Sequence, residues 1–241
     1  MKTDIEIKEE VKERYAGIVQ TPRHSCGCGN KSTLEVNYSQ IEGYNPDADY
    51  GLGCGTPTAF ANIKEGMTVL DLGSGAGIDC FIAAKYVGAS GKVIGVDMTE
   101  EMIKKANENK NKLNIPNVDF RLGEIESLPV DSGTVDRVIS NCVINLVPHK
   151  EKAFSEIHRV LKPGGKFTVS DIVTDGKISE EERRDASLWA GCVSGALEKK
   201  DYLAIIEKAG FKEISVTSEV KGEHQLSGGA GLYSITVTGT K

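Results

Sequence analysis

A short run containing three glycines constrains this chain more than any other feature. Gly73, Gly75 and Gly77 lie between an apolar segment at Met67–Leu72, expected to be a buried strand, and a helical segment at Ile78–Tyr86. Glycine has no Cβ, so the backbone there can turn tightly and approach a ligand that a side chain would exclude. We therefore expect a ligand to bind against this loop, and a tight strand-to-helix turn without a ligand is the alternative.

Short apolar runs alternate with helical segments along most of the chain. Strands are expected at 67–72, 92–96, 118–122, 135–140, 166–172, 213–220 and 232–238, and helices at 4–16, 78–86, 100–113, 150–161, 179–191 and 201–209. Strands separated by single helices imply right-handed parallel crossovers, and so predict an α/β, doubly wound, mostly parallel seven-stranded sheet. Ligands in such sheets bind at the carboxyl ends of the strands, where Asp97 would accept hydrogen bonds from a ribose diol.

The length of 241 residues requires only one large domain with one core. We expect an N-terminal helix and cysteine-bearing loops over residues 1–60 and a ligand-binding core over 61–175. Residues 176–241 are expected to supply lid helices and terminal strands that complete the same domain.

Charge and hydropathy exclude several classes of function. The net charge is −6 and no long basic cluster occurs, which argues against a nucleic-acid partner. No apolar run approaches the roughly 18 residues of a membrane span, and the first 25 residues do not resemble a signal peptide, so we expect a cytoplasmic protein without a membrane partner. Six cysteines are unusual in that compartment, which indicates ligation or redox chemistry rather than disulfides.

The spacing of the glycines separates two classes of cofactor. A dinucleotide fingerprint beginning at Gly73 would need a small residue at Ile78, whereas the third glycine comes one place earlier. The loop resembles the D-x-G-x-G-x-G loop of class I (Rossmann-like) S-adenosylmethionine methyltransferases, as do Gly123–Pro129 and the L-K-P-G-G turn at Leu161–Lys166. This resemblance covers roughly 67–172, and it implies an S-adenosylmethionine site formed by Asp71, Gly73, Ser74, Gly75, Gly77, Asp97, Met98, Ile125, Glu126 and Asn141.

The segments around four cysteines are more specific. They read G-C-G around Cys54, D-L-G-S-G-x-G-x-D-C ending at Cys80, S-N-C-V-I-N-L around Cys142 and C-V-x-G-A-L beginning at Cys192. Together these segments resemble the arsenite methyltransferases. That resemblance implies that Cys142 and Cys192 bind As(III) with Cys54 as a third thiolate, and that Cys80 exchanges disulfides with Cys54.

The chemistry agrees with the resemblance. Trivalent arsenic is soft and prefers thiolates, and with three sulfurs bound it keeps a lone pair that can attack the sulfonium methyl of S-adenosylmethionine. No general base is then needed, and positioning can supply roughly 7–11 kcal/mol of the barrier. Each methylation oxidises arsenic, so the expected partners are arsenite or its thiol conjugates and a reductant such as thioredoxin or a small thiol.

Other interpretations stay open. Cys80 lies in an apolar stretch and can be a packing residue. His24, Cys26 and Cys28 form a short cluster whose C-x-C spacing is tighter than that usual for zinc. The chain could instead methylate carbon or oxygen of a small, quinone-like organic acceptor, or bind As(III) through thiols without turnover.

Overall fold

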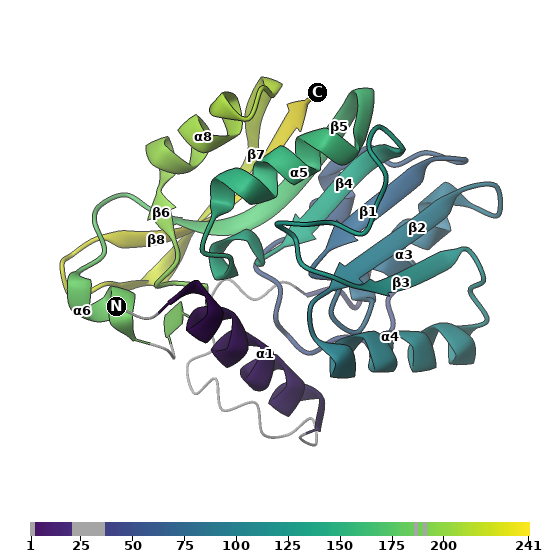
Figure 1. The fold of residues 1–241 in the computed structure, drawn as a ribbon, viewed down its shortest axis with the longest axis horizontal. Coiled ribbons are helices and arrows are strands. Elements are labelled where there is room, and N and C mark those ends of the chain that lie inside the picture. Colours follow the sequence, from purple (N-terminus) through teal and green to yellow (C-terminus); the bar gives the residue numbers. More distant parts are fainter. Residues whose placement is uncertain (1–2, 21–36, 186–187, 190–191) are drawn as a thin grey trace.

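The computed structural model describes residues 3–20, 37–185, 188–189 and 192–241. Five parallel strands form one side of the sheet, namely β3 (Val118–Leu122), β2 (Lys92–Asp97), β1 (Thr68–Leu72), β4 (Val135–Asn141) and β5 (Leu161–Thr174). The antiparallel strands β8 (Gly231–Thr240) and β7 (Lys212–Gln225) follow, which completes the order β3-β2-β1-β4-β5-β8-β7. This confirms the doubly wound α/β fold (Figure 1).

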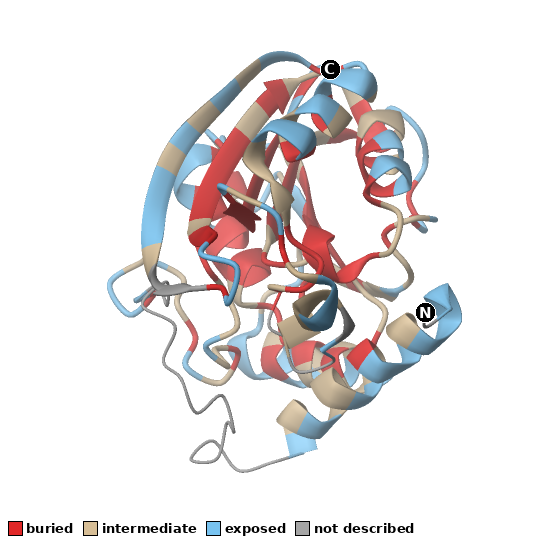
Figure 2. Cartoon of the chain, turned by 90° about the vertical axis from the view of Figure 1, so that its left-hand side faces the viewer, coloured by how far each residue is buried: buried red, intermediate tan, exposed pale blue. Residues whose placement is uncertain are grey.

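Helices cover both faces of the sheet because the strands are apolar on both faces. Val69 packs with α3 (Ile78–Val87) and α4 (Glu100–Leu113), whereas Leu70, the next residue, packs with α5 (Lys150–Val160) and α8 (Lys199–Lys208). Successive side chains of a strand point to opposite faces, so one continuous apolar run serves two cores. Figure 2 shows the buried strands enclosed by helices whose exposed faces point outward.

Three short elements escaped the sequence analysis: α2 (Pro57–Phe60), the 3-10 turn η1 (Ile144–Leu146) and β6 (Leu197–Glu198). Strand β6 has two residues and pairs with β5 off the main path, so the sheet has eight strands rather than the expected seven. The helix expected at 179–191 is interrupted where it is described: α6 (Glu180–Arg184) ends before Asp185, and residues 188–189 are helical again. Residues 186–187 and 190–191 lie outside the described part. Periodicity over so few residues is too weak to mark such elements.

The first helix, α1 (Asp4–Gln20), lies across the sheet edge at which β1, β2 and β4 end (Figure 1). Its Val11 is buried, and its Tyr15 packs against two apolar clusters. No helix among the described residues is long and apolar enough to cross a membrane. The expected division into residues 1–60, 61–175 and 176–241 remains a prediction.

Candidate functional site

A cleft lies at the carboxyl edge of the sheet, where the fold predicts a ligand site. It encloses about 1090 Å³ of space, part of which is open to solvent. Its walls come from the glycine loop, the ends of β2 and β4, the loop after β3, and α1. All but one of the ten expected cofactor residues line it: Asp71, Gly73, Ser74, Gly75, Asp97, Met98, Ile125, Glu126 and Asn141.

The glycine loop forms a bare surface of this cleft. The amides of Gly73 and Ser74 both donate to the Val96 carbonyl, at 2.8 and 3.0 Å, so the loop is tied to β2. Gly73 and Gly75 have φ angles of +65° and +51°, which other residues rarely adopt. A Cβ on Gly75 would have no protein atom closer than the Met102 sulfur at 3.9 Å. The loop therefore fits a cofactor that approaches the backbone closely.

Asp97 supplies the acidic group that the fold places beside a ribose. Its Oδ2 accepts from the Gly75 amide and its Oδ1 from the Thr99 amide, each at 2.9 Å. Burial raises the pKa of Asp97, while these backbone hydrogen bonds oppose the rise. An ionised carboxylate is an acceptor only, which is what the two hydroxyl groups of a ribose diol require of a partner. The residues present therefore fit a ribose diol.

Gly77 is the expected cofactor residue that does not line the cleft. Its φ is +100°, and a Cβ there would lie 2.7 Å from the Phe120 ring and 2.9 Å from the Phe81 ring. The third glycine is thus required by packing between α3 and β3. Gly77 therefore shapes the loop through packing in the core, against Phe81 and Phe120, and not by lining the cleft.

Asn141 does more than line the cleft. Its Oδ1 accepts from the amides of Cys54 and Gly55, at 3.1 and 3.2 Å, and its Nδ2 donates to the Gly55 carbonyl at 2.8 Å. The same Nδ2 lies within hydrogen-bonding distance of the Tyr38 hydroxyl and of Asp79 Oδ2. Asn141 therefore fastens the Cys54 loop to the end of β4, directly beside Cys142.

Tyr38 and Asp79, which were not expected as site residues from the sequence, also belong to this network. The Tyr38 hydroxyl lies 2.9 Å from the Gly55 carbonyl and 3.1 Å from Asp79 Oδ2. Burial raises the pKa of Asp79 to about 6, although the hydrogen bonds from Asn141 and Tyr38 act against the rise. Tyr38 lies in a loop without periodicity, so no sequence signal would have identified it.

Three thiols gather beside the cleft: Cys54, Cys142 and Cys192 belong to one buried cluster and are 7%, 7% and 3% exposed. The Cys192 thiol donates to the Cys142 carbonyl at 2.8 Å. Contact with Cys192, then contact with Cys54, then burial raise the pKa of the Cys142 thiol well above its usual value. Cys142 and Cys192 both have left-handed backbones, with φ of +60° and +63°. The structure thus brings the three expected arsenic ligands together, and Cys142 also lines the cleft.

The thiols are neighbours rather than a closed ligand set. All four cysteines in the described part of the chain are free. Within the same part, no three His, Cys, Asp or Glu side chains already converge to hold a metal ion.

Cys80 lies apart from these three. Its thiol donates to Asp71 Oδ2 at 3.2 Å, and its side chain is fully buried in the core between α3 and the sheet. Burial, followed by the nearby Asp71, raises the pKa of the Cys80 thiol well above its usual value. Burial likewise raises the pKa of Asp71, with a further contribution from Asp79. These contacts make Cys80 a packing residue in this conformation, and its exchange with Cys54 remains a proposal. His24, Cys26 and Cys28 lie outside the described residues.

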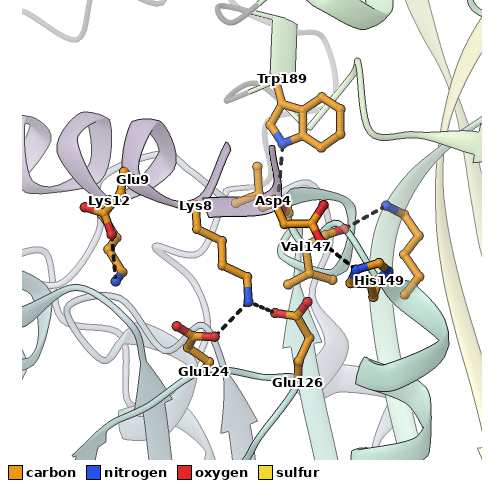
Figure 3. A network of polar contacts seen from close by, with 11 residues as sticks. Asp4, Lys8, Glu9, Lys12, Glu124, Glu126, Val147, His149 and Trp189 are labelled. Carbon is orange, nitrogen blue, oxygen red and sulfur yellow. Dashed lines mark hydrogen bonds and ion pairs between the residues drawn. The ribbon is translucent and has the colours of Figure 1, made fainter. Parts of the chain in front are cut away.

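The α1 helix covers the cleft and the thiols together. Lys8 Nζ lies 2.7 Å from Glu124 Oε2 and 2.6 Å from Glu126 Oε2, after β3, and Asp4 Oδ2 lies 2.7 Å from His149 Nε2 (Figure 3). Val11 and Tyr15, one and two turns beyond Lys8, line the cleft and pack on the thiol cluster. Burial raises the pKa of Tyr15, and the nearby Cys192 and Cys142 raise it further. The sequence predicts this helix but not its position over the cleft.

Known methyltransferases are similar to this chain in both sequence and structure. Residues 63–210 match the family described as a methyltransferase domain. The chain is 46% identical to an arsenite methyltransferase of Halobacterium salinarum, over 88% of this chain and 59% of the relative, and 40% identical to one of Aquipseudomonas alcaligenes, over 95% and 70%. Among solved structures it is similar to an arsenic(III) S-adenosylmethionine methyltransferase from Chlamydomonas reinhardtii, with a TM-score of 0.71, 38% identity, and coverage of 78% of this chain and 67% of that one.

The chain thus spans about three fifths of the Halobacterium relative and about two thirds of the other two. These similarities confirm the class I methyltransferase fold and S-adenosylmethionine as the cofactor. The chain therefore belongs to the arsenite methyltransferases, within the methyltransferase-domain family.

Proposed function

We propose that this chain methylates thiol-bound trivalent arsenic with S-adenosylmethionine. The observation that carries the proposal is the position of Cys142, which lines the cofactor cleft and also belongs to the buried cluster with Cys54 and Cys192. A substrate held by these thiols would lie at the wall of the cofactor cleft.

The thiols would bind arsenic without needing a base. Each As–S bond forms as one hydroxyl of arsenite leaves with the thiol proton as water, so the raised pKa of the Cys142 thiol is no obstacle. Arsenic, a soft acceptor, prefers these sulfurs to the carboxylates of the cleft. Three such bonds would leave the arsenic lone pair free to point into the cleft.

The bound cofactor supplies an electrophilic methyl group on its sulfonium. Transfer of that methyl group to the arsenic lone pair would break the S–C bond, form an As–C bond, release S-adenosylhomocysteine and raise arsenic from the trivalent to the pentavalent state. The role of the protein is to hold the two reactants in line, an effect that can be worth roughly 7–11 kcal/mol. Asp97 and the glycine loop hold one reactant, and the thiols hold the other.

Return to trivalent arsenic requires two electrons. In the proposed relay Cys54 and Cys80 supply them as they form a disulfide, and thioredoxin or a small thiol then reduces that disulfide. Cys80 must first leave its hydrogen bond to Asp71. Disulfide mapping by mass spectrometry after one turnover tests this step, because a bridge that excludes Cys80 would remove it from the relay.

The central experiment mixes purified, reduced protein with S-adenosylmethionine and arsenite and measures methylarsenicals. We expect methylation by the wild type and none by Cys142→Ser or Cys192→Ser. Cys80→Ser is the matched control, because it should keep a single turnover and lose repeated turnover. Full activity in Cys142→Ser would remove the proposed site, and activity insensitive to thiol alkylation would favour an organic acceptor.

Arsenic coordination tests Cys54 separately. X-ray absorption of the arsenic-loaded, reduced protein should show three sulfurs in the wild type and two in Cys54→Ser. Two sulfurs in the wild type would leave Cys54 as a redox thiol only.

A further inference from the structure

A buried polar unit lies behind the thiol cluster, outside the cofactor cleft. It consists of Asn145, Lys150 and Asp171, which are 0%, 6% and 0% exposed. None of the three lines the cleft. Burying two charges and an amide is costly unless they satisfy one another, so the unit calls for a physical explanation.

Asp171 anchors the turn that follows Cys142. Its Oδ2 accepts from the Asn145 amide at 3.1 Å and from the Tyr202 hydroxyl at 3.2 Å, while its Oδ1 accepts from the Ile172 amide at 3.0 Å. Asn145 is the middle residue of η1. The carboxylate on β5 therefore ties η1 to the sheet.

Lys150 holds the same turn from its other side. Its Nζ donates to the carbonyls of Asn145 and Val147, at 3.4 and 3.3 Å. Burial raises the pKa of Asp171 to about 7 and lowers the pKa of Lys150 to about 8, and the opposite charge of each group acts against these shifts. The two side chains therefore hold the middle of η1 and the residue that follows it.

The Asn145 side chain then joins the turn to the segment of Cys192. Its Nδ2 donates to the Ile172 carbonyl at 2.6 Å and to the Cys192 carbonyl at 3.3 Å. The backbone three residues beyond Cys192 is also close, since a Cβ on Gly195 would lie 2.0 Å from the Asn145 carbonyl oxygen. Cys142 itself donates its amide to the Ser170 carbonyl at 2.8 Å.

We propose that Asn145, Lys150 and Asp171 are positioning residues that set the separation of the Cys142 and Cys192 thiols, and so determine the affinity for As(III) without touching arsenic or cofactor. The left-handed backbones of both cysteines support this assignment, because such conformations persist only where the surroundings enforce them. The inference rests on the proposed arsenic-binding function.

Asn145→Ala tests the bridge. Loss of partners that orient ligands typically weakens metal binding by about 10- to 100-fold, so we expect a comparable rise in the Kd for arsenite, measured by equilibrium dialysis of the reduced protein. The Kd for S-adenosylmethionine should change by no more than about twofold, because no residue of the unit lines the cleft.

Asn109→Ala is the matched control. Asn109 is also fully buried, and its amide donates to the Ala76 and Asp47 carbonyls on the other side of the sheet. It should lower thermal stability about as much as Asn145→Ala but leave the arsenite Kd unchanged. Equal loss of arsenite binding in both variants, or unchanged binding in Asn145→Ala, would overturn the inference.

Variants of Lys150 distinguish a role in positioning η1 from a role in balancing the charge of Asp171. Lys150→Met should weaken arsenite binding and stability together, because it leaves Asp171 unpaired. Lys150→Met with Asp171→Asn removes both charges and should recover stability, but not arsenite affinity, since the hydrogen bonds to η1 stay broken. Recovery of wild-type affinity in the double variant would overturn the positioning role. If the wild type itself does not bind arsenite, the proposed function has failed, and that result is visible before any variant is compared.

Discussion

The two halves of the site are constructed in different ways. The cofactor half comes from neighbouring parallel strands and the loop after β1, and backbone amides and glycines shape it, as in the bonds from Gly75 and Thr99 to Asp97. The thiol half collects Cys54, Cys142 and Cys192 from three distant segments. A site made from local backbone depends on conformation, whereas one made from distant side chains depends on the hydrogen bonds that hold its segments together.

The halves meet at the end of β4 and beneath α1. Asn141 reaches the Cys54 loop, Cys142 faces both halves, and Val143 packs against Gly73. Changes on one side of this junction should therefore affect one half, and changes at the junction should affect both.

Gly73→Ala should have the largest effect on stability. Its Cβ would lie 2.5 Å from Val143, and its φ of +65° is unfavourable for alanine. Together these effects should cost about 2–5 kcal/mol, compared with about 1–2 kcal/mol for Gly75→Ala, which has only the backbone cost. Urea unfolding measures both, and Gly73→Ala with Val143→Ala should recover part of the difference. If Gly73→Ala and Gly75→Ala lost the same free energy of unfolding, the contact between Gly73 and Val143 would not couple the two halves.

Asp79→Asn tests the network that joins α3 to the Cys54 loop. The pKa of Asp79 is raised to about 6 from 3.8, so the folded protein keeps a proton that the unfolded chain releases between those pH values. The free energy of unfolding contributed by this group therefore falls as pH rises through that window and is constant above it. The stability of Asp79→Asn relative to wild type should grow over the same window, by up to about 3 kcal/mol. A difference independent of pH would contradict this.

Asp97→Asn should weaken the cofactor half alone. A hydrogen bond to a charged group is worth about 1.5–3 kcal/mol, so the Kd for S-adenosylmethionine should rise about 10- to 100-fold. Arsenite binding should be unchanged. Asp119→Asn is the control, because Asp119 pairs with Arg121 on β3 and does not line the cleft. Loss of arsenite binding in Asp97→Asn would show that the halves do not act independently.

Lys8→Met should have the smallest effect. It removes the ion pairs that fasten α1 to Glu124 and Glu126, and such partly exposed pairs are worth about 1 kcal/mol or less. Calorimetry should show a small loss of thermal stability, with cofactor affinity changed by no more than about threefold and arsenite affinity unchanged. A large loss of arsenite affinity would show that the Lys8 contacts also hold the Val11 and Tyr15 end of α1 in place.

Much of the fold could be predicted from the sequence because its signals are local. The order of strands and helices from β1 to β8 follows from periodicity, and β1, α3 and α4 begin within a residue of their expected positions. β5 begins five residues earlier and β7 extends five residues further than expected, since pairing with neighbouring strands decides where a strand ends. The two-residue β6 exists only because β5 lies beside it.

The sequence by itself determined the cofactor loop, Asp97 and the identity of the cysteines, since each depends on residues near one another along the chain. Only the tertiary structure decided which thiols meet. It placed Cys54 beside Cys142 through Asn141, kept the Cys80 thiol in the core beneath α3 with Asp71, and laid α1 over both halves. The contacts of Cys54 with Asn141 and of Lys8 with Glu124 join residues 87 and 116 positions apart, and no periodic pattern in the chain records them.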